Sequence, residues 1–276
     1  MTEKTFRSNI QIAVEKVRVE NPLAPSITNT VTQDFVANAQ LAIGGSAAMV
    51  YLPDEGEAIA NFARAVYINL GTMFPFYAET IPRTLRALKN KNTPFVLDPV
   101  AIGIGTLRTE LLTQMKNFKP TIIRGNPSEI IALAKLWDLN DHEGGKVRGV
   151  DSTENVDEAA YSAIRLAKFT GGAVAVSGAK DLITDGEFAI YSSGGSPLFT
   201  KITGSGCALG GVMAVYLTVA SPIIAAFTGA AIFNRAGSLA AEKSSTPASF
   251  KVAFLDELYK VSASDVASSE FQVFPC

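Results

Sequence analysis

The chain has 276 residues, of which 47% are hydrophobic and 18% charged, so it can bury the core of one large α/β domain or of two small ones. Its formal net charge of −2 provides no basic excess, which argues against nucleic-acid binding. Two cysteines make no disulfide framework and fit a cytoplasmic protein, and the single histidine, His142, excludes a site built from several histidines.

The N-terminal residues 1–16 mix charged and apolar side chains and lack the apolar core of a signal peptide. Short apolar runs that predict strands then recur at residues 47–52, 65–71, 94–100, 121–126 and 171–178. Helical spacing follows the first four runs and precedes the last, over residues 54–65, 75–91, 108–118, 127–137 and 156–169. Continuous apolar runs that alternate with helices indicate a parallel sheet whose strands are buried on both faces.

The segment 182–192 breaks this alternation, because Asp185-Gly186 between two β-rich runs is a hairpin signal. We therefore expect the sheet to end in an antiparallel hairpin. No linker, charge run or repeat divides the chain, which favours a single domain over residues 1–276. The uncharged segment 208–233 is long enough to span a bilayer, but Ser221-Pro222 lies midway and is typical of a helix start. We expect two successive buried helices there and no membrane span.

The residues at the strand ends carry the candidate chemistry, because ligands of an open parallel sheet bind outside the carboxyl ends of its strands. These positions are Met49, Asn69, Asp98, Arg124, Ser177 and the loop at Gly204. The loop sequence GSGCAL lacks the third glycine of a dinucleotide fingerprint, and no P-loop motif occurs in the chain. A glycine-rich turn that enters a helix still favours an anion.

Two further residues, Asp98 and Arg124, suggest phosphoryl transfer. Asp98 ends a buried strand, where it either holds Mg²⁺ through water or caps the turn before Pro99. Arg124 follows an apolar run and suits phosphate recognition. In the sequence NPSE, Asn126 and Glu129 predict a capping box around Pro127, which explains Glu129 without any function.

Eight segments together resemble the hydroxyethylthiazole kinases over nearly the whole chain. In chain order they are ITNTVTQDFVANAQLAIGGSAAMV (27–50), INLGT (68–72), LDPV (97–100), RTE (108–110), IRGNPSEI (123–130), GVDS (149–152), TDGE (184–187) and LFTKITGSGCALGGVMAV (198–215). The resemblance implies a ribokinase-like three-layer α/β/α fold. It also implies transfer of the γ-phosphate of ATP to the primary hydroxyl of 4-methyl-5-(2-hydroxyethyl)thiazole, a salvage step toward thiamine.

The resemblance also implies roles for individual residues. Met49, Gly204 and Asn29 match thiazole-binding positions. Arg124 and Ser177 match ATP-binding positions, and Asp98 and Glu129 match acids that act on Mg²⁺ and the phosphates. The family is a homotrimer with its thiazole sites between subunits, so we expect Asn29 and Met49 to serve a neighbour's Cys207.

Cys207 matches the position of the catalytic residue. Related ribokinase-like enzymes carry an aspartate there, which takes the proton of the alcohol. A helix N-terminus lowers the pKa of a thiol, whereas a nearby triphosphate raises it. We expect Cys207 to be a weak base, with most of the rate acceleration coming from alignment of the alcohol and neutralisation of the phosphates.

The chain departs from the family pattern at three places. Pro25-Ser26 stand where a histidine is usual, Ala101 replaces a glycine, and SGAKD (177–181) replaces Thr-Gly-Glu-Val-Asp. Two alternatives remain open on the sequence alone. One is another ribokinase-like small-molecule kinase or an ATP-dependent dehydratase, and the other is a catalytically weak relative that binds thiazole.

Overall fold

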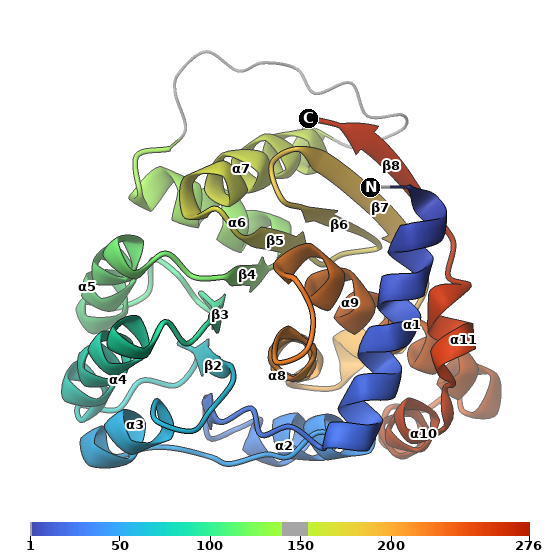
Figure 1. Cartoon of the computed structure of the whole chain (residues 1–276), viewed down its shortest axis with the longest axis horizontal. Coiled ribbons are helices and arrows are strands. Elements are labelled where there is room, and N and C mark those ends of the chain that lie inside the picture. The colour runs from blue at the N-terminus through green and yellow to red at the C-terminus, as the bar shows by residue number, and fades with distance from the viewer. Residues whose placement is uncertain (1, 140–153) are drawn as a thin grey trace.

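The computed structural model describes residues 2–139 and 154–276. His142 and the segment 149–152 lie outside the described residues. Within the described part of the chain, eight strands form one sheet whose spatial order follows the chain order (Figure 1). The strands are β1 (Ser26–Ile27), β2 (Val66–Asn69), β3 (Phe95–Asp98), β4 (Ile122–Gly125), β5 (Ala173–Val176), β6 (Lys180–Thr184), β7 (Phe188–Ser193) and β8 (Phe271–Pro275).

The direction of the strands confirms the expected topology and extends it. Strands β1 to β5 pair in parallel, and β5 to β8 pair antiparallel. The predicted hairpin around Asp185-Gly186 is formed by β6 and β7. The C-terminal strand β8, which the sequence did not suggest, adds one more antiparallel strand beside β7.

The first strand prediction is wrong. Residues 47–52 form no named strand, and Met49 makes only an isolated parallel bridge to Ser26 on the two-residue strand β1. The run lies outside β1 at the sheet edge, where it has a strand partner on one side only. The apolar run 47–52 therefore does not mark a central strand of the sheet.

Helices cover both faces of the sheet and form the three layers. Figure 1 shows α3, α4 and α5 on one side of the strands and α1, α8 and α9 on the other. One core cluster joins the sheet to α1 (Glu3–Glu20), α2 (Gln33–Ala42), α8 (Ser205–Leu217), α9 (Pro222–Lys243), α10 (Pro247–Lys260) and α11 (Ala263–Ala267). The other core cluster joins it to α3 (Pro53–Ile59), α4 (Tyr77–Lys91), α5 (Thr106–Met115), α6 (Pro127–Leu136) and α7 (Glu154–Thr170). Two short 3₁₀ turns, Lys116–Phe118 and Pro197–Lys201, complete the connections.

Successive strand residues alternate between the two cores, which is why the apolar runs are continuous. On β2, for example, Tyr67 belongs to the core under α8 and Ile68 to the opposite core. Val96 and Leu97 divide in the same way on β3. Because side chains on a strand alternate between faces, the polar residue that follows each run projects toward one known side of the sheet.

The apolar segment 208–233 is divided as expected, with α8 ending at Leu217 and Pro222 opening α9. Among the described residues, α9 is the one helix long and apolar enough to cross a membrane by length and composition. Its apolar window is 78% buried inside the protein, as in the core helix of a globular domain.

The loop after β3 contains a backbone conformation that glycine adopts more readily than alanine. Ala101 has a φ of +58°, in the left-handed region. The Cβ of an L-residue costs about 1–2 kcal/mol per residue in that region. This explains in physical terms why glycine is usual at this position in the family that the sequence resembles.

We expect Ala101→Gly to raise the free energy of unfolding by about 0.5–1 kcal/mol, because relief of the backbone strain exceeds the added entropy of the unfolded chain. Denaturant unfolding followed by circular dichroism measures the change. Ala179→Gly is the control, since Ala179 also lies in a loop, is exposed, and has no positive φ. A loss of stability in Ala101→Gly equal to that of the control would contradict the explanation.

Candidate active site

Four parallel strands bring polar side chains together at the first turn of α8. Asn69 and Asp98 are register partners at the ends of β2 and β3. Each of the residues Asn69, Asp98 and Arg124 is preceded, two positions earlier, by a residue of the core cluster that includes α8, namely Tyr67, Val96 and Ile122. Since side chains two apart share a face, Asn69, Asp98 and Arg124 project to the α8 side. The strand-end residues that the sequence analysis singled out therefore lie together on one side of the sheet; their role as the site stays a prediction.

Asp98 lies at the centre of the cluster and is completely buried. Its Oδ2 atom accepts hydrogen bonds from the Tyr67 hydroxyl at 3.0 Å, the Asn69 Nδ2 at 3.2 Å and the Arg124 Nη1 at 3.3 Å. Its Oδ1 atom is also buried and has no hydrogen-bond partner. All hydrogen-bond donors to this carboxylate therefore approach Oδ2, and Oδ1 accepts none.

Arg124 connects the acid to the next strand and to α8. Its Nη2 donates to the Ser177 hydroxyl at 2.5 Å, while its buried Nε has no partner. A Cβ on Gly206 would lie 2.5 Å from both Nη atoms, so the glycine lets the helix start pack directly on the guanidinium. The cation is thus held between Asp98, Ser177 and the first turn of α8.

Cys207 accepts hydrogen bonds from two amides on two different strand ends. The Asn29 Nδ2 and the Asn69 Nδ2 each lie 3.3 Å from its sulfur. The Asn29 amide also donates to the Asn69 Oδ1 at 3.1 Å. Asn29 therefore contacts Cys207 of its own chain, and the expectation that it would serve a neighbour's thiol is corrected.

The turn before Cys207 has the geometry that the glycine pattern indicated. Gly204 caps α8 with a φ of +86°, and a Cβ there would lie 2.6 Å from the Thr32 Cγ2. No side chain caps the helix, and Ala208 N–H is the donor to the Gly204 carbonyl at 2.8 Å. The three amides before Ala208 are the ones that a helix start leaves without partners inside the helix.

Burial dominates the electrostatics of the cluster. It raises the pKa of Asp98 to about 6, against the opposing effect of Arg124. Burial and the nearby Asp98 raise the pKa of the Cys207 thiol. This direction is opposite to the lowering expected from the helix N-terminus alone. The thiol is accordingly neutral at physiological pH even without a bound phosphate.

Glu129 forms the predicted capping box. Its carboxylate accepts the Asn126 N–H at 2.9 Å, and the Asn126 side chain accepts the Glu129 N–H at 2.9 Å. Glu129 also lies near enough to Asp98 to raise the pKa of that acid. Met49, at the sheet edge beside Ser26, is partly buried against the core under α8.

Sequence reasoning missed Tyr67 and left Asn69 without a role. Tyr67 is completely buried inside an apolar run, where an aromatic residue is ordinarily a core residue. The spacing could have indicated Tyr67, because it lies two residues before Asn69 on the same strand. The two side chains therefore lie on the same face of the sheet as Asp98.

Asp181 was also missed. Its Oδ1 accepts the Gly178 N–H at 3.1 Å and its Oδ2 accepts the Asn234 Nδ2 at 2.7 Å. Burial raises its pKa. These bonds tie the turn that carries Ser177 to α9.

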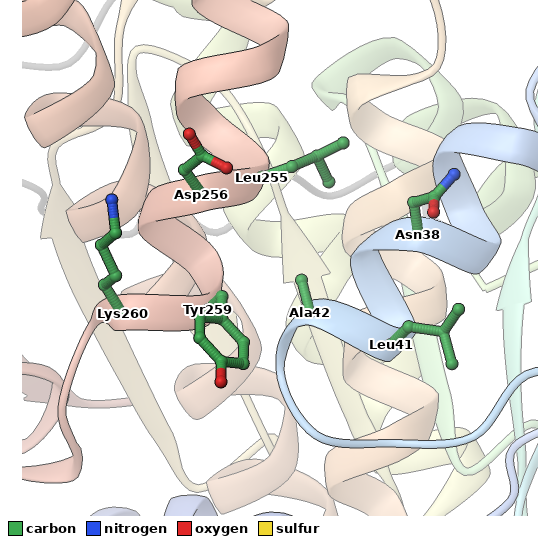
Figure 2. A pocket seen from close by; sticks show the side chains of 7 residues that line it. All are labelled: Asn38, Leu41, Ala42, Leu255, Asp256, Tyr259 and Lys260. Atoms are coloured by element: carbon green, nitrogen blue, oxygen red, sulfur yellow. The ribbon is translucent and has the colours of Figure 1, made fainter.

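A depression of about 360 Å³ lies elsewhere, between α2 and α10 (Figure 2). Its lining residues are Asn38, Leu41, Ala42, Leu255, Asp256, Tyr259 and Lys260. These residues come from the two helices alone, and no strand end contributes. It is therefore distinct from the cluster around Cys207.

Comparison with known proteins agrees with this geometry. The profile of the hydroxyethylthiazole kinase family matches residues 14–264. The chain belongs to this family. The hydroxyethylthiazole kinase of Bifidobacterium longum is 47% identical to it over 290 aligned positions, which cover 98% of this chain and 92% of that protein. This relationship decides against a different ribokinase-like kinase or a dehydratase.

Solved structures support the same fold. The structure of a hydroxyethylthiazole kinase protein from Pyrococcus horikoshii has a TM-score of 0.86 at 27% identity and covers 96% of this chain and 98% of that one. A ribokinase-like superfamily protein from Enterococcus faecalis has a TM-score of 0.63 at 12% identity and covers 95% and 96% of the two chains. The second match concerns the fold alone, and it agrees with the expected ribokinase-like architecture of the hydroxyethylthiazole kinases.

The raised pKa and burial of Cys207 predict slow alkylation. At pH 7.5 we expect iodoacetamide to modify Cys207 roughly tenfold more slowly than Cys276, because Cys207 is buried and Cys276 is exposed, while burial raises the pKa of both thiols. The Cys207 rate should climb as the pH rises above 9. Mass spectrometry of the two cysteine peptides measures both rates in one sample. Equal rates at pH 7.5 would mean that the thiol is ionised or open to solvent.

Proposed function

We propose that this chain transfers the γ-phosphate of ATP to the primary hydroxyl of 4-methyl-5-(2-hydroxyethyl)thiazole, a salvage step toward thiamine in the cytoplasm. The observation that carries this proposal is one continuous set of contacts at the start of α8. It runs from Cys207 through Asn69 to Asp98, and from Asp98 to Arg124 at 3.3 Å. Membership of the hydroxyethylthiazole kinase family supplies the substrate class.

Arg124 and Ser177 bind the nucleotide phosphates in this proposal. Arg124 is a buried cation with an unpartnered Nε, and a guanidinium suits phosphate oxygens. The amides from Ser205 to Cys207 point from a helix N-terminus, where negative charge is favoured. Charge that develops on the transferred phosphoryl group would be stabilised by these fixed donors, which is the main source of rate in this reaction class.

Asn29 and Gly204 bind the thiazole alcohol, with Met49 contributed by a neighbouring subunit, and Cys207 lies beside the hydroxyl. The alcohol oxygen bonds to the γ-phosphorus as the bond from phosphorus to the ADP oxygen breaks. Because burial and Asp98 raise the pKa of the thiol, Cys207 assists the departure of the alcohol proton only weakly. Alignment of the two substrates contributes more than proton transfer.

The carboxylate oxygens of Asp98 and Glu129 are of the kind that Mg²⁺ takes as ligands. Asp98 offers Oδ1, a buried carboxylate oxygen without a partner, and Mg²⁺ is commonly held by one or two carboxylates together with substrate phosphates. Glu129 is the second acid, on the first turn of α6. Within residues 2–139 and 154–276, no group of three His, Cys, Asp or Glu forms a protein-only metal site. Bound Mg²⁺ would neutralise phosphate charge.

We also propose a homotrimer with each thiazole site near a subunit boundary. Two large apolar side chains close in sequence to Asn29 and Met49 are exposed, Val31 by 67% and Leu52 by 50%. A neighbouring subunit that covers them would bury this apolar surface. In this trimer Met49 lies against the thiazole site of the neighbouring subunit, whereas Asn29 serves the site of its own chain.

A catalytically weak relative that binds thiazole is the second candidate. In the segment SGAKD, Ala179 replaces the usual acid, and the Lys180 Nζ lies 4.9 Å from the centroid of the Tyr191 ring rather than in the cluster described above. An acid that the family usually has near the nucleotide is therefore missing.

A coupled assay distinguishes the two candidates. We expect release of ADP from Mg-ATP to depend on added hydroxyethylthiazole and to stop when EDTA removes the metal. Calorimetry measures thiazole binding in the same preparation. Binding of the alcohol without any release of ADP would favour the catalytically weak relative.

Substitution of Cys207 tests the limited role of the thiol. We expect Cys207→Asp to remain active or become faster, because a carboxylate is largely deprotonated at neutral pH and can accept the alcohol proton, whereas the Cys207 thiol keeps its own proton. Cys207→Ala should keep measurable turnover, with a loss below about a hundredfold, the lower end of ordinary general-base contributions, because Cys207 is a weak base. Steady-state kinetics with both substrates varied gives kcat and KM. Complete loss of turnover in both variants would show an essential function of the thiol.

A further inference from the structure

We propose that Tyr67 and Asn69 are positioning residues that hold the Asp98 carboxylate by Oδ2 and keep Oδ1 free for the metal-phosphate group. The inference rests on the proposed kinase function and adds two residues to its machinery. Neither residue touches a substrate in this proposal. Both act through the orientation of Asp98.

The distribution of donors on Asp98 is the first argument. An ionised carboxylate accepts through two oxygens, and each offers about two lone-pair sites. The donor groups of Tyr67, Asn69 and Arg124 all approach Oδ2, the Asn69 Nδ2 sharing its two hydrogens with the Tyr67 oxygen and the Cys207 sulfur, and none approaches Oδ1. A buried carboxylate oxygen without a partner carries the full desolvation penalty of its burial. An oxygen kept in this condition is poised to accept a ligand.

The hydroxyl of Tyr67 has a fixed direction. It accepts a hydrogen bond from the Asn69 Nδ2 at 2.9 Å and donates its proton to Asp98 at 3.0 Å. Since the Tyr67 oxygen already accepts from Asn69, its own hydrogen is directed to Asp98 Oδ2, and Tyr67 acts as a donor to that one oxygen of the acid.

A glycine inside α8 makes room for this tyrosine. A Cβ on Gly210 would lie 2.5 Å from the Tyr67 Cε2 and 2.7 Å from its hydroxyl oxygen. Glycine in a helix interior destabilises the helix relative to alanine. This packing accounts for a glycine that the anion-binding turn does not need.

Asn69 connects the acid to the alcohol side of the site. Its Oδ1 accepts the Gly71 N–H at 2.9 Å and the Asn29 amide at 3.1 Å, and its Nδ2 reaches toward Tyr67, Asp98 and Cys207. Loss of the Tyr67 hydroxyl should disturb the acid alone. Loss of the Asn69 amide should disturb both the acid and the residues beside the alcohol.

The test compares Tyr67→Phe, Asn69→Ala and a matched control, Tyr216→Phe. Tyr216 is also completely buried, and its hydroxyl has no hydrogen-bond partner. Removal of that hydroxyl therefore breaks no hydrogen bond. Electron paramagnetic resonance measures the affinity for Mn²⁺ in the presence of a non-hydrolysable ATP analogue. Calorimetry measures thiazole binding, steady-state kinetics gives kcat, and thermal unfolding checks the fold.

We expect Tyr67→Phe to weaken Mn²⁺ binding by roughly 10- to 100-fold, the range for residues that orient a metal ligand, and to lower kcat while thiazole affinity stays unchanged. Asn69→Ala should weaken both Mn²⁺ and thiazole binding. Tyr216→Phe should match the wild type in all three measurements. Metal binding is read without turnover, so failure of the kinase proposal would appear separately, as a wild type that releases no ADP.

Wild-type Mn²⁺ affinity in a folded Tyr67→Phe variant would overturn the proposal. If that variant does not fold, Asn69→Ala decides, and unchanged metal affinity there would overturn the proposal equally. A loss of metal affinity in Tyr216→Phe of the same size would also overturn it, because any buried tyrosine would then have the same effect.

Discussion

The buried pairing of Asp98 with Arg124 is the interaction on which the rest of the site depends. Removing both charges from water costs several kcal/mol per ion, and the mutual attraction returns that cost only with good additional hydrogen bonds. Here the bonds are incomplete, since Asp98 Oδ1 and Arg124 Nε have no partners. A pair that served stability alone would gain from satisfying them. The two open atoms instead point to a ligand that completes the network.

The pKa of Asp98 shows the cost of this arrangement. Burial raises this pKa to about 6, above the ordinary value in an unfolded chain. At a pH between the two values, the folded state keeps the proton on Asp98 and the unfolded state has lost it. Folding stability from this group is therefore present at low pH and falls as the pH rises toward 6. At neutral pH the protein keeps an ionised acid that folding disfavours, which is a trade expected at a functional site.

Sequence patterns predicted the sheet direction, the hairpin, the helix break at Pro222 and the strand-end location of Asp98, Arg124 and Ser177. These features depend on local periodicity and on one topological rule, and both can be read without coordinates. Strand β1 was missed because two residues carry too little periodicity, and β8 because its pairing is with a distant segment. Tyr67 was missed for a related reason. Its role follows from which side chains approach Asp98, and that is fixed only by long-range packing.

The same buried environment explains why a thiol suits the first turn of α8. Asn69 already donates toward both Asp98 and Cys207, and within the described cluster Arg124 is the cation that opposes the charge of Asp98. A carboxylate at residue 207 would place a second buried negative charge beside the first, and like charges at short range raise each other's pKa. A neutral thiol avoids that repulsion and still accepts two amide hydrogen bonds. The chain thus has a neutral group instead of an ionised base at residue 207 and keeps a single well-oriented acid at residue 98, which is consistent with catalysis by charge placement more than by proton transfer.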